Sequence, residues 1–285
     1  MAAAPRRRRA HGVLPGFGLS LGFTLLYLSL IVLIPLSTIF LKTLTLSWQE
    51  FWSTVTAPRT LAAYRLSFTA AAAAAVVNGV FGLLLAWVLE RYAFPGRRLL
   101  DGLVDLPFAL PTAVAGISLA SLWARDGWLG RWLAPLGIEV AYTPLGVVVA
   151  LVFVGLPFVV RTVQPVLRDL DPAVEEAAAS LGAGRLAALR RVVLPELRPA
   201  AITGSVLAFA RGLGEFGSVI FIAGNMPMRS EITPLLIMIE LEQYDYAGAT
   251  AIALLFLLAS FALLLVMNFL LRRQARALTA VDEER

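Results

Sequence analysis

The sequence predicts an all-α membrane protein that crosses the bilayer six times. Of its 285 residues, 59% are hydrophobic and 15% are charged, whereas soluble domains are nearer half apolar and a quarter charged. Six stretches of about 19 or more residues are nearly free of charge, which is enough to cross a hydrocarbon core of about 30 Å. Runs this long exclude a β-barrel, whose strands show only a weak alternation of apolar and polar residues. The expected spans are 17–41, 66–89, 103–124, 141–160, 199–223 and 247–271.

Composition excludes several kinds of chemical site. The chain has no cysteine, so it has neither a disulfide nor a thiolate metal site. Its single histidine, His11, lies in the N-terminal tail, which excludes a multi-histidine metal site. The sequence contains no G-x-x-x-x-G-K-[ST] phosphate-binding loop, so we do not expect this chain to hydrolyse ATP. We expect no catalytic residue, no metal and no cofactor.

The basic residues indicate membrane topology and not a nucleic-acid partner. A net charge of +5 would suit a nucleic-acid-binding protein, but most of the 24 lysines and arginines lie in two loops and the two terminal tails. Positively charged loops stay in the cytoplasm, so both termini and the fourth loop are predicted to be cytoplasmic. The residues that set this orientation are Arg6–Arg9, Arg91, Arg97, Arg98, Arg161, Arg168, Arg185, Arg190, Arg191, Arg198, Arg272, Arg273, Arg276 and Arg285.

The first apolar run follows four arginines and is predicted to be a retained helix. A basic start before an apolar stretch also marks secretory signal peptides, whose apolar region is about 7–15 residues long. The run from Gly16 to Leu41 is far longer. We therefore expect a basic cytoplasmic tail over 1–16, then a first transmembrane helix and outer loop over 17–58.

The second span is predicted to lie at the centre of the helix bundle. It contains an alanine run over 70–75, followed by Gly79 and Gly82. Small residues let helices approach closely in lipid. An alanine run can also reflect composition alone, and the sequence leaves that alternative open.

The third span contains two prolines, Pro107 and Pro111, in the stretch LVDLPFALPTAVAG. Proline removes a backbone donor and kinks a helix. Broken helices in transporters often line a cavity, which makes both prolines candidates for a translocation path. An ordinary kink near a helix start explains them equally well.

The fifth span carries two opposite charges, Arg211 and Glu215, in FARGLGEFGSV. Charges inside a membrane are costly and face the interior of a bundle or a cavity. At a spacing of four residues they share one helix face and can pair. They either line a translocation path, with Arg211 available to an anion, or form a buried pair that fixes helix packing.

A polar segment at 171–195, DPAVEEAAASLGAGRLAALRRVVLP, interrupts the apolar chain between the fourth and fifth spans. Asp171 before Pro172 predicts a helix start, because aspartate caps helices and proline suits the first helical position. Gly182 predicts the end of that helix. A second short helix is expected over Arg185–Val193, ending before Pro195. The segment should therefore form a cytoplasmic helical hairpin.

The spacing of residues in this hairpin matches the EAA loop, E-A-A-x3-G-x9-[IV]-x-L-P, with valine where the strictest pattern has isoleucine. The segment resembles the loop of permease subunits in binding-protein-dependent ABC importers. The resemblance implies that the loop couples to a separate ATPase subunit. The residues concerned are Glu175, Glu176, Ala177, Ala178, Gly182, Val192, Leu194 and Pro195.

Over a longer stretch, roughly residues 60–272, the chain resembles the T-type permease subunit of sulfate/thiosulfate importers. This resemblance implies the six-helix type I ABC importer (MetI-like) permease fold, with a transmembrane domain over 59–272 and a cytoplasmic tail over 273–285. The strings that carry it are LPTAVAGISLASLW (110–123), TPLGVVVALVFVGLPFVVRTVQPVL (143–167), GEFGSVIFIAGNMP (214–227) and TPLLIMIELEQYDYAGATAIA (233–253).

The same resemblance implies a set of partners in the bacterial cytoplasmic membrane. These are an ABC ATPase dimer, a homologous W-type permease and a periplasmic sulfate-binding protein. A molybdate or tungstate permease is the nearest alternative. A secondary transporter working alone would have no use for the EAA loop. A membrane-embedded enzyme would need His, Asp or Glu clustered at one depth, and spans one, two, four and six are nearly uncharged.

Overall fold

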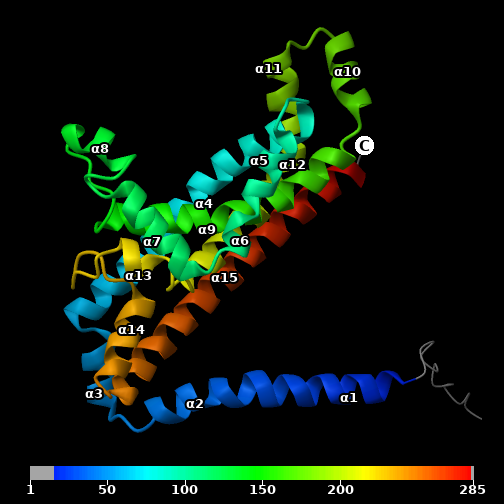
Figure 1. Ribbon diagram of the computed structural model, residues 1–285. Helices are drawn as coiled ribbons and strands as arrows, with labels where there is room; N and C mark the ends of the chain where they lie inside the picture. Colours follow the sequence, from blue (N-terminus) through cyan, green and yellow to red (C-terminus); the bar gives the residue numbers. More distant parts are fainter. Residues whose placement is uncertain (1–15, 284–285) are drawn as a thin grey trace, which may run out of the picture.

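The computed structural model describes the backbone of residues 16–283 and the side chains of 16–269, except those of Pro172, Glu175 and Arg185. The tail arginines Arg6–Arg9 and His11 lie outside the described residues. Within the described part of the chain all regular structure is helical (Figure 1). Five helices are long and apolar enough to cross a membrane: Phe17–Thr43, Pro58–Arg91, Pro144–Asp169, Leu186–Leu213 and Tyr246–Phe269.

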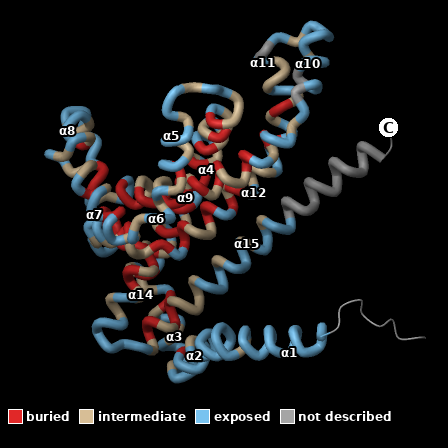
Figure 2. The backbone as a smooth tube through the Cα atoms, turned by 45° about the vertical axis from the view of Figure 1, so that its right-hand side comes forward, coloured by how far each residue is buried: buried red, intermediate tan, exposed pale blue. Residues whose placement is uncertain are grey.

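Three helices, α4 (Pro58–Arg91), α9 (Pro144–Asp169) and α12 (Leu194–Leu213), pack together as the core. Figure 2 shows the buried residues concentrated on them. A Cβ on Gly82 of α4 or on Gly204 of α12 would come within 3 Å of Val159 on α9. The two glycines therefore let α4 and α12 approach α9 closely. Four alanines of the 70–75 run are buried as well, which confirms the central place predicted for the second span.

The fourth predicted span ends too early, because α9 continues from residue 160 to Asp169. The prediction stopped at the first charged residue, Arg161. In the structure this arginine and Arg168 are both paired with carboxylates, so the helix can continue through them.

The third predicted span is a chain of three short helices and not one long helix. These are α5 (Arg97–Val104), α6 (Leu106–Ala109) and α7 (Thr112–Trp123). Leu110 is extended, with φ −81° and ψ 135°, because a proline disfavours the helical conformation of the residue before it. The break at Leu110–Pro111 therefore follows from Pro111.

The fifth predicted span, 199–223, is also interrupted. Its helix α12 ends at Leu213, and a turn over 214–218 leads to the single helical turn α13 (Val219–Ile222). The turn contains Gly214 and Gly217, which weaken a helix by the entropy that glycine loses on ordering.

The prediction that the second hairpin helix ends before Pro195 is wrong. The chain runs from α11 (Arg185–Ala188) through a π turn, η3 (Leu189–Val193), into α12 as one helical rod. A proline ring normally meets the carbonyl oxygen four residues earlier, here that of Arg191. The wider π turn just before Pro195 lets the helix continue past this clash.

The end of the bundle opposite the hairpin is fastened by an ion pair whose acid is buried. Arg59 at the start of α4 donates to both carboxylate oxygens of Glu231, at 2.7 and 2.8 Å. Glu231 is 2% exposed and lies just before α14 (Thr233–Glu242), which packs on α15 (Tyr246–Glu283). The remaining short elements are α3 (Trp48–Val55), α8 (Gly130–Leu133) and the 3₁₀ turn η2 (Ala134–Leu136).

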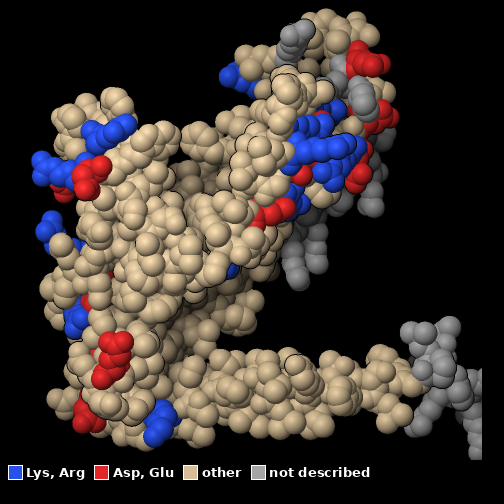
Figure 3. Space-filling model, viewed as in Figure 1, with Lys and Arg blue, Asp and Glu red and all other residues tan. Residues whose placement is uncertain are grey.

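The first helical rod, residues 17–43, projects away from the core. It consists of α1 (Phe17–Leu28), the π turn η1 (Ser29–Leu33) and α2 (Ile34–Thr43). Only Thr43, at its last position, is buried, and α2 alone packs against α15 (Figure 1). Figure 3 shows a broad belt of uncharged surface between charged side chains at the hairpin end and at the opposite end.

Candidate functional site

The hairpin begins at an aspartate cap, as the sequence predicts. Helix α10 (Pro172–Ser180) starts after Asp171, whose carboxylate accepts a hydrogen bond from the Ala173 N–H at 2.9 Å. The helix stops at a left-handed turn where Gly182 has φ +82°. Figure 1 shows α10 and α11 projecting beyond the ends of the core helices.

The projecting hairpin exposes apolar as well as polar side chains. Leu181 is 89% exposed at its tip, and Leu186 and Val174 are exposed on its two arms. Isolated exposed leucines are common, but a projecting element that gathers several of them is typical of a docking surface.

The eight motif residues are distributed over both arms of the hairpin. Glu175, Glu176, Ala177 and Ala178 lie on α10, and the side chain of Glu175 is outside the described residues. Gly182 forms the turn. The last three motif residues lie on the continuous rod, where Val192 and Leu194 are half-buried and Pro195 is exposed. Glu176 and Ala177 are exposed, so the α10 half of the motif faces outward.

The two interruptions of the bundle, at Leu110–Pro111 and at 214–218, lie against each other. A Cβ on Gly116 of α7 would meet the Ser218 carbonyl oxygen at 2.4 Å. A Cβ on Gly217 would meet the side-chain oxygen of Thr112. The backbones of these two segments therefore approach closely, and the start of α7 cannot shift without displacing the turn over 214–218.

Arg211 and Glu215 are paired at this junction, although not on one helix face. Arg211 is in the last turn of α12, while Glu215 lies beyond the helix end. Their charged atoms are 2.7 Å apart. Glu215 also accepts hydrogen bonds from the Ser218 N–H and hydroxyl, at 2.9 and 2.8 Å. The glutamate is buried at 1% exposure, whereas the arginine is 36% exposed.

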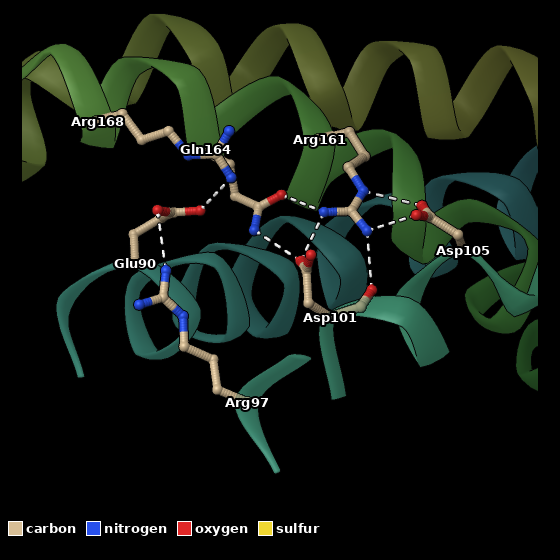
Figure 4. Close-up of polar contacts among 7 residues, drawn as sticks. All are labelled: Glu90, Arg97, Asp101, Asp105, Arg161, Gln164 and Arg168. Atoms are coloured by element: carbon tan, nitrogen blue, oxygen red, sulfur yellow. Dashed lines mark hydrogen bonds and ion pairs between the residues drawn. The ribbon is translucent and has the colours of Figure 1, made fainter. Parts of the chain in front are cut away.

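Two neighbouring ionic clusters, with six charged side chains and one amide between them, join the third segment (α5–α7) to α9 and to α4 (Figure 4). Arg161 of α9 donates to Asp105 from Nε at 2.8 Å and from Nη2 at 2.6 Å. Its Nη1 donates to Asp101 at 2.7 Å and to the Gln164 side chain at 2.5 Å. The hydrogen bond from Gln164, together with Arg161, holds the pKa of the Asp101 carboxyl below its usual range.

A second, separate cluster is centred on Glu90 of α4. Arg168 of α9 contacts this carboxylate at 2.7 Å, and Arg97 contacts it at 3.4 Å. The two clusters together contain three acids and three arginines, so their charges cancel overall.

A cavity of about 820 Å³ lies between α4, α12 and α15. Its walls are mostly small or apolar side chains such as Ala72, Gly79 and Ser205, with Arg190 and Arg198 where α12 nears the hairpin. The lining does not include the candidate path residues Pro107, Pro111, Arg211 and Glu215. Pro111, Arg211 and Glu215 lie at the junction of the two interruptions, and Pro107 lies on α6 just before the break.

Comparison with known proteins identifies the family. The model of the family described as "Binding-protein-dependent transport system inner membrane component" matches residues 78–280. The chain belongs to this family. It is a permease subunit, and its relatives are named as transport permeases and not as enzymes.

Two relatives show how far this permease resembles proteins already named. The sulfate transport system permease protein CysT of Salmonella typhimurium is 54% identical over 276 residues, which is 97% of this chain and 98% of that one. The CysT protein of Synechococcus elongatus is 50% identical and covers 87% of this chain and 89% of its own.

Solved structures place the permease in the fold of ABC importers. A bacterial ABC transporter that imports the acidic polysaccharide alginate superposes with a TM-score of 0.75 at 15% identity, over 90% of this chain and 96% of that one. The MetNI methionine ABC transporter gives 0.54 at 19% identity, over 81% and 99%. At these identities the likeness concerns the fold alone.

Sequence reasoning missed the two ionic clusters around Arg161 and Glu90 of the permease. Arg161 and Asp101 are 60 positions apart, and each alone is an ordinary charged residue near a span end. The available signal was Arg161 itself, which follows an apolar run of α9 and therefore needs a partner.

Proposed function

We propose that the permease is a subunit of an ATP-driven importer of sulfate and thiosulfate. The observation that carries this proposal is the 54% identity to a named sulfate permease along nearly the whole of both chains. Fold likeness alone would not select an anion, since the solved relatives transport alginate and methionine.

The hairpin is the coupling element of this proposal. Its α10 arm exposes Glu176 and Ala177, and the Gly182 turn places Leu181 at the tip. Glu176 and Gly182 with their neighbours would dock into a cleft of a separate ATPase subunit, since this chain has no phosphate-binding loop of its own.

The junction of the two interruptions is the proposed part of the translocation path. Broken helices in transporters bring backbone groups and charges to a cavity that the substrate crosses. Pro111 shapes one side of the junction, with Pro107 on the preceding helix α6, and the pair of Arg211 and Glu215 lies on the other side. Arg211 is the cation through which an oxyanion would be attracted, because it keeps 36% of its side chain exposed while paired.

The proposal extends to domain limits, partners and orientation. Residues 59–272 would form the transmembrane domain, with the hairpin and both termini in the bacterial cytoplasm. The first helix begins and α15 ends on the side of the molecule that carries the hairpin, which supports this orientation (Figure 1). The partners would be an ATPase dimer, a homologous W-type permease and a periplasmic sulfate-binding protein.

A transport cycle follows from these parts. ATP binding closes the ATPase dimer and moves the docked hairpins. The permease pair then opens outward and accepts the anion from the binding protein, and hydrolysis resets it. The chain performs no covalent step.

The decisive experiment measures anion-stimulated ATPase activity of the reconstituted complex. Sulfate and thiosulfate, delivered with the binding protein, should raise the ATPase rate and drive uptake into vesicles. Stimulation by molybdate or tungstate but not by sulfate would replace the proposed substrate. Sulfate uptake by the permease without any ATPase would overturn the ATP-driven mechanism.

A further inference from the structure

We propose that Arg161 is a positioning residue that makes α9 and the broken third segment move together. It would thereby carry motion of the hairpin to the junction of the two interruptions. This inference rests on the proposed function, because it assumes that an ATPase moves the hairpin.

The guanidinium of Arg161 uses every donor that it has. An arginine side chain carries five N–H groups in a planar fork. In the structure these make five hydrogen bonds at 2.5–2.8 Å, all to the third segment except one to Gln164 of α9 itself. The main-chain oxygen of Asp101 accepts one of the five from Nη2, so the arginine holds the backbone of α5 as well as the two carboxylates.

The position of Arg161 along the chain suits such a connection. It lies on α9, which ends at Asp169 and continues directly into the hairpin at Asp171. Its second partner, Asp105, immediately precedes α6, and α6 ends at the Leu110–Pro111 break. One side chain therefore joins the helix that bears the hairpin to the segment that leads into the break.

Close packing continues the connection from the break to the fifth segment. The start of α7 lies against the turn over 214–218, where Gly116 meets the backbone of Ser218. Ser218 in turn donates to Glu215, the partner of Arg211. A shift of the third segment would therefore displace the paired charges of the proposed path.

The neighbouring Arg168 provides a matched control. It lies on the same helix and nearer the hairpin, yet it pairs with Glu90 of α4 and its side chain is 59% exposed. Arg168→Gln removes one ion pair of the neighbouring cluster without touching α5. Arg161→Gln removes every guanidinium contact to α5.

The test follows movement at the break in the complete complex with its ATPase, second permease and binding protein. The chain has no cysteine, so Val114→Cys places one reporter thiol in this subunit on α7, just beyond the break. With cysteine-free partner subunits, ATP should change the labelling rate of this thiol in the otherwise unsubstituted chain. The change should persist in Arg168→Gln and be lost in Arg161→Gln, while ATP hydrolysis continues.

A covalent replacement separates this role from a purely structural one. Arg161→Cys with Asp105→Cys should lose sulfate uptake per ATP hydrolysed, and a reducible bis-thiol cross-linker should restore it until reduction. Restoration without the arginine shows that the connection itself is what matters. A structural role predicts that stability, ATPase activity and uptake fall together and that cross-linking restores none selectively.

The outcomes distinguish this inference from the proposed function. If sulfate neither stimulates the ATPase nor enters vesicles, the proposed substrate fails, but the ATP response at Val114 still reports on Arg161. An Arg161→Gln complex that keeps the full ATP-dependent change overturns the inference. A break that never responds to ATP in the chain that carries Val114→Cys alone overturns it as well.

Discussion

At the scale of single residues, the pair at Arg211 and Glu215 is asymmetric. The carboxylate is buried and held by three donors, two of them from Ser218. The guanidinium is partly exposed, so water can solvate it if the glutamate charge is lost. Removing the arginine leaves a buried charge with fewer donors, which costs more than leaving an exposed cation unpaired.

Arg211→Gln should therefore destabilise the permease more than Glu215→Gln does. We expect a loss of about 1–3 kcal/mol for the arginine variant, the usual cost of an under-satisfied buried group. The glutamine at 215 keeps an acceptor for Ser218 and should cost less. Thermal unfolding of both variants in the same detergent measures the difference. An equal or reversed order would contradict the burial argument. Normal sulfate uptake by Arg211→Gln would separately remove the arginine from the proposed path.

At the scale of helices, the approach of α9 to α12 depends on one glycine. A Cβ on Gly204 would lie 2.8 Å from the Val159 Cα and 3.1 Å from the Phe158 oxygen, both backbone atoms that cannot rotate away. A Cβ on Gly212, in the last turn of the same helix, would meet Ala71 at an ordinary 3.5 Å.

Gly204→Ala is expected to destabilise the core by about 1–3 kcal/mol, the usual cost of overpacking. Gly212→Ala should be neutral or gain up to about 1 kcal/mol from helix propensity. Chemical denaturation in mixed micelles compares the two variants directly. A similar loss for both would mean that the helix, and not its contact with α9, is what the substitutions disturb.

The hairpin turn gives a second prediction at this scale. Gly182 has φ +82° with no atom near its missing Cβ, so only conformation restricts the residue. Gly182→Asn should be tolerated better than Gly182→Val, since asparagine enters the left-handed region more readily. The readout is ATPase activity stimulated by the permease. Gly184→Val, in open space without a positive φ, serves as control.

Short sequence signals correctly predicted local structure in this chain. They could not predict contacts between helices that are far apart in the sequence. Asp171 with Pro172 correctly marked the start of α10, because capping depends on neighbours in sequence. Pro195 was misread as a helix end, since relief by a π turn leaves no separate sequence signal. The ion pairs of Arg161 depend on how α5 and α9 meet in space, which one sequence does not contain.

At the scale of the whole molecule, the helical rod over 17–43 stands apart from the core. The solved methionine transporter chain matches 99% of its own length to only 81% of this chain, so the shared fold does not need every segment present here. Contact between the rod and the bundle is made through α2 and α15.

Deleting residues 1–41 should leave the core intact and loosen α15. Amide hydrogen exchange should show unchanged protection in α4, α9 and α12, because the deleted part contributes no buried residue among those described. Exchange in α15 should rise where α2 packs on it. Global loss of protection would show that the rod supports the core.

The uncovered rod also sets an order of events during synthesis. A helix that satisfies its own backbone groups and buries almost none of its described side chains can leave the ribosome-bound insertion channel as soon as it is made. Helix α4 cannot settle so early, because the face that carries its buried alanines Ala70, Ala71 and Ala74 packs against α9 and α12, which are made later. The first helix therefore anchors the nascent chain in the membrane before α9 and α12 have been made and the core can assemble.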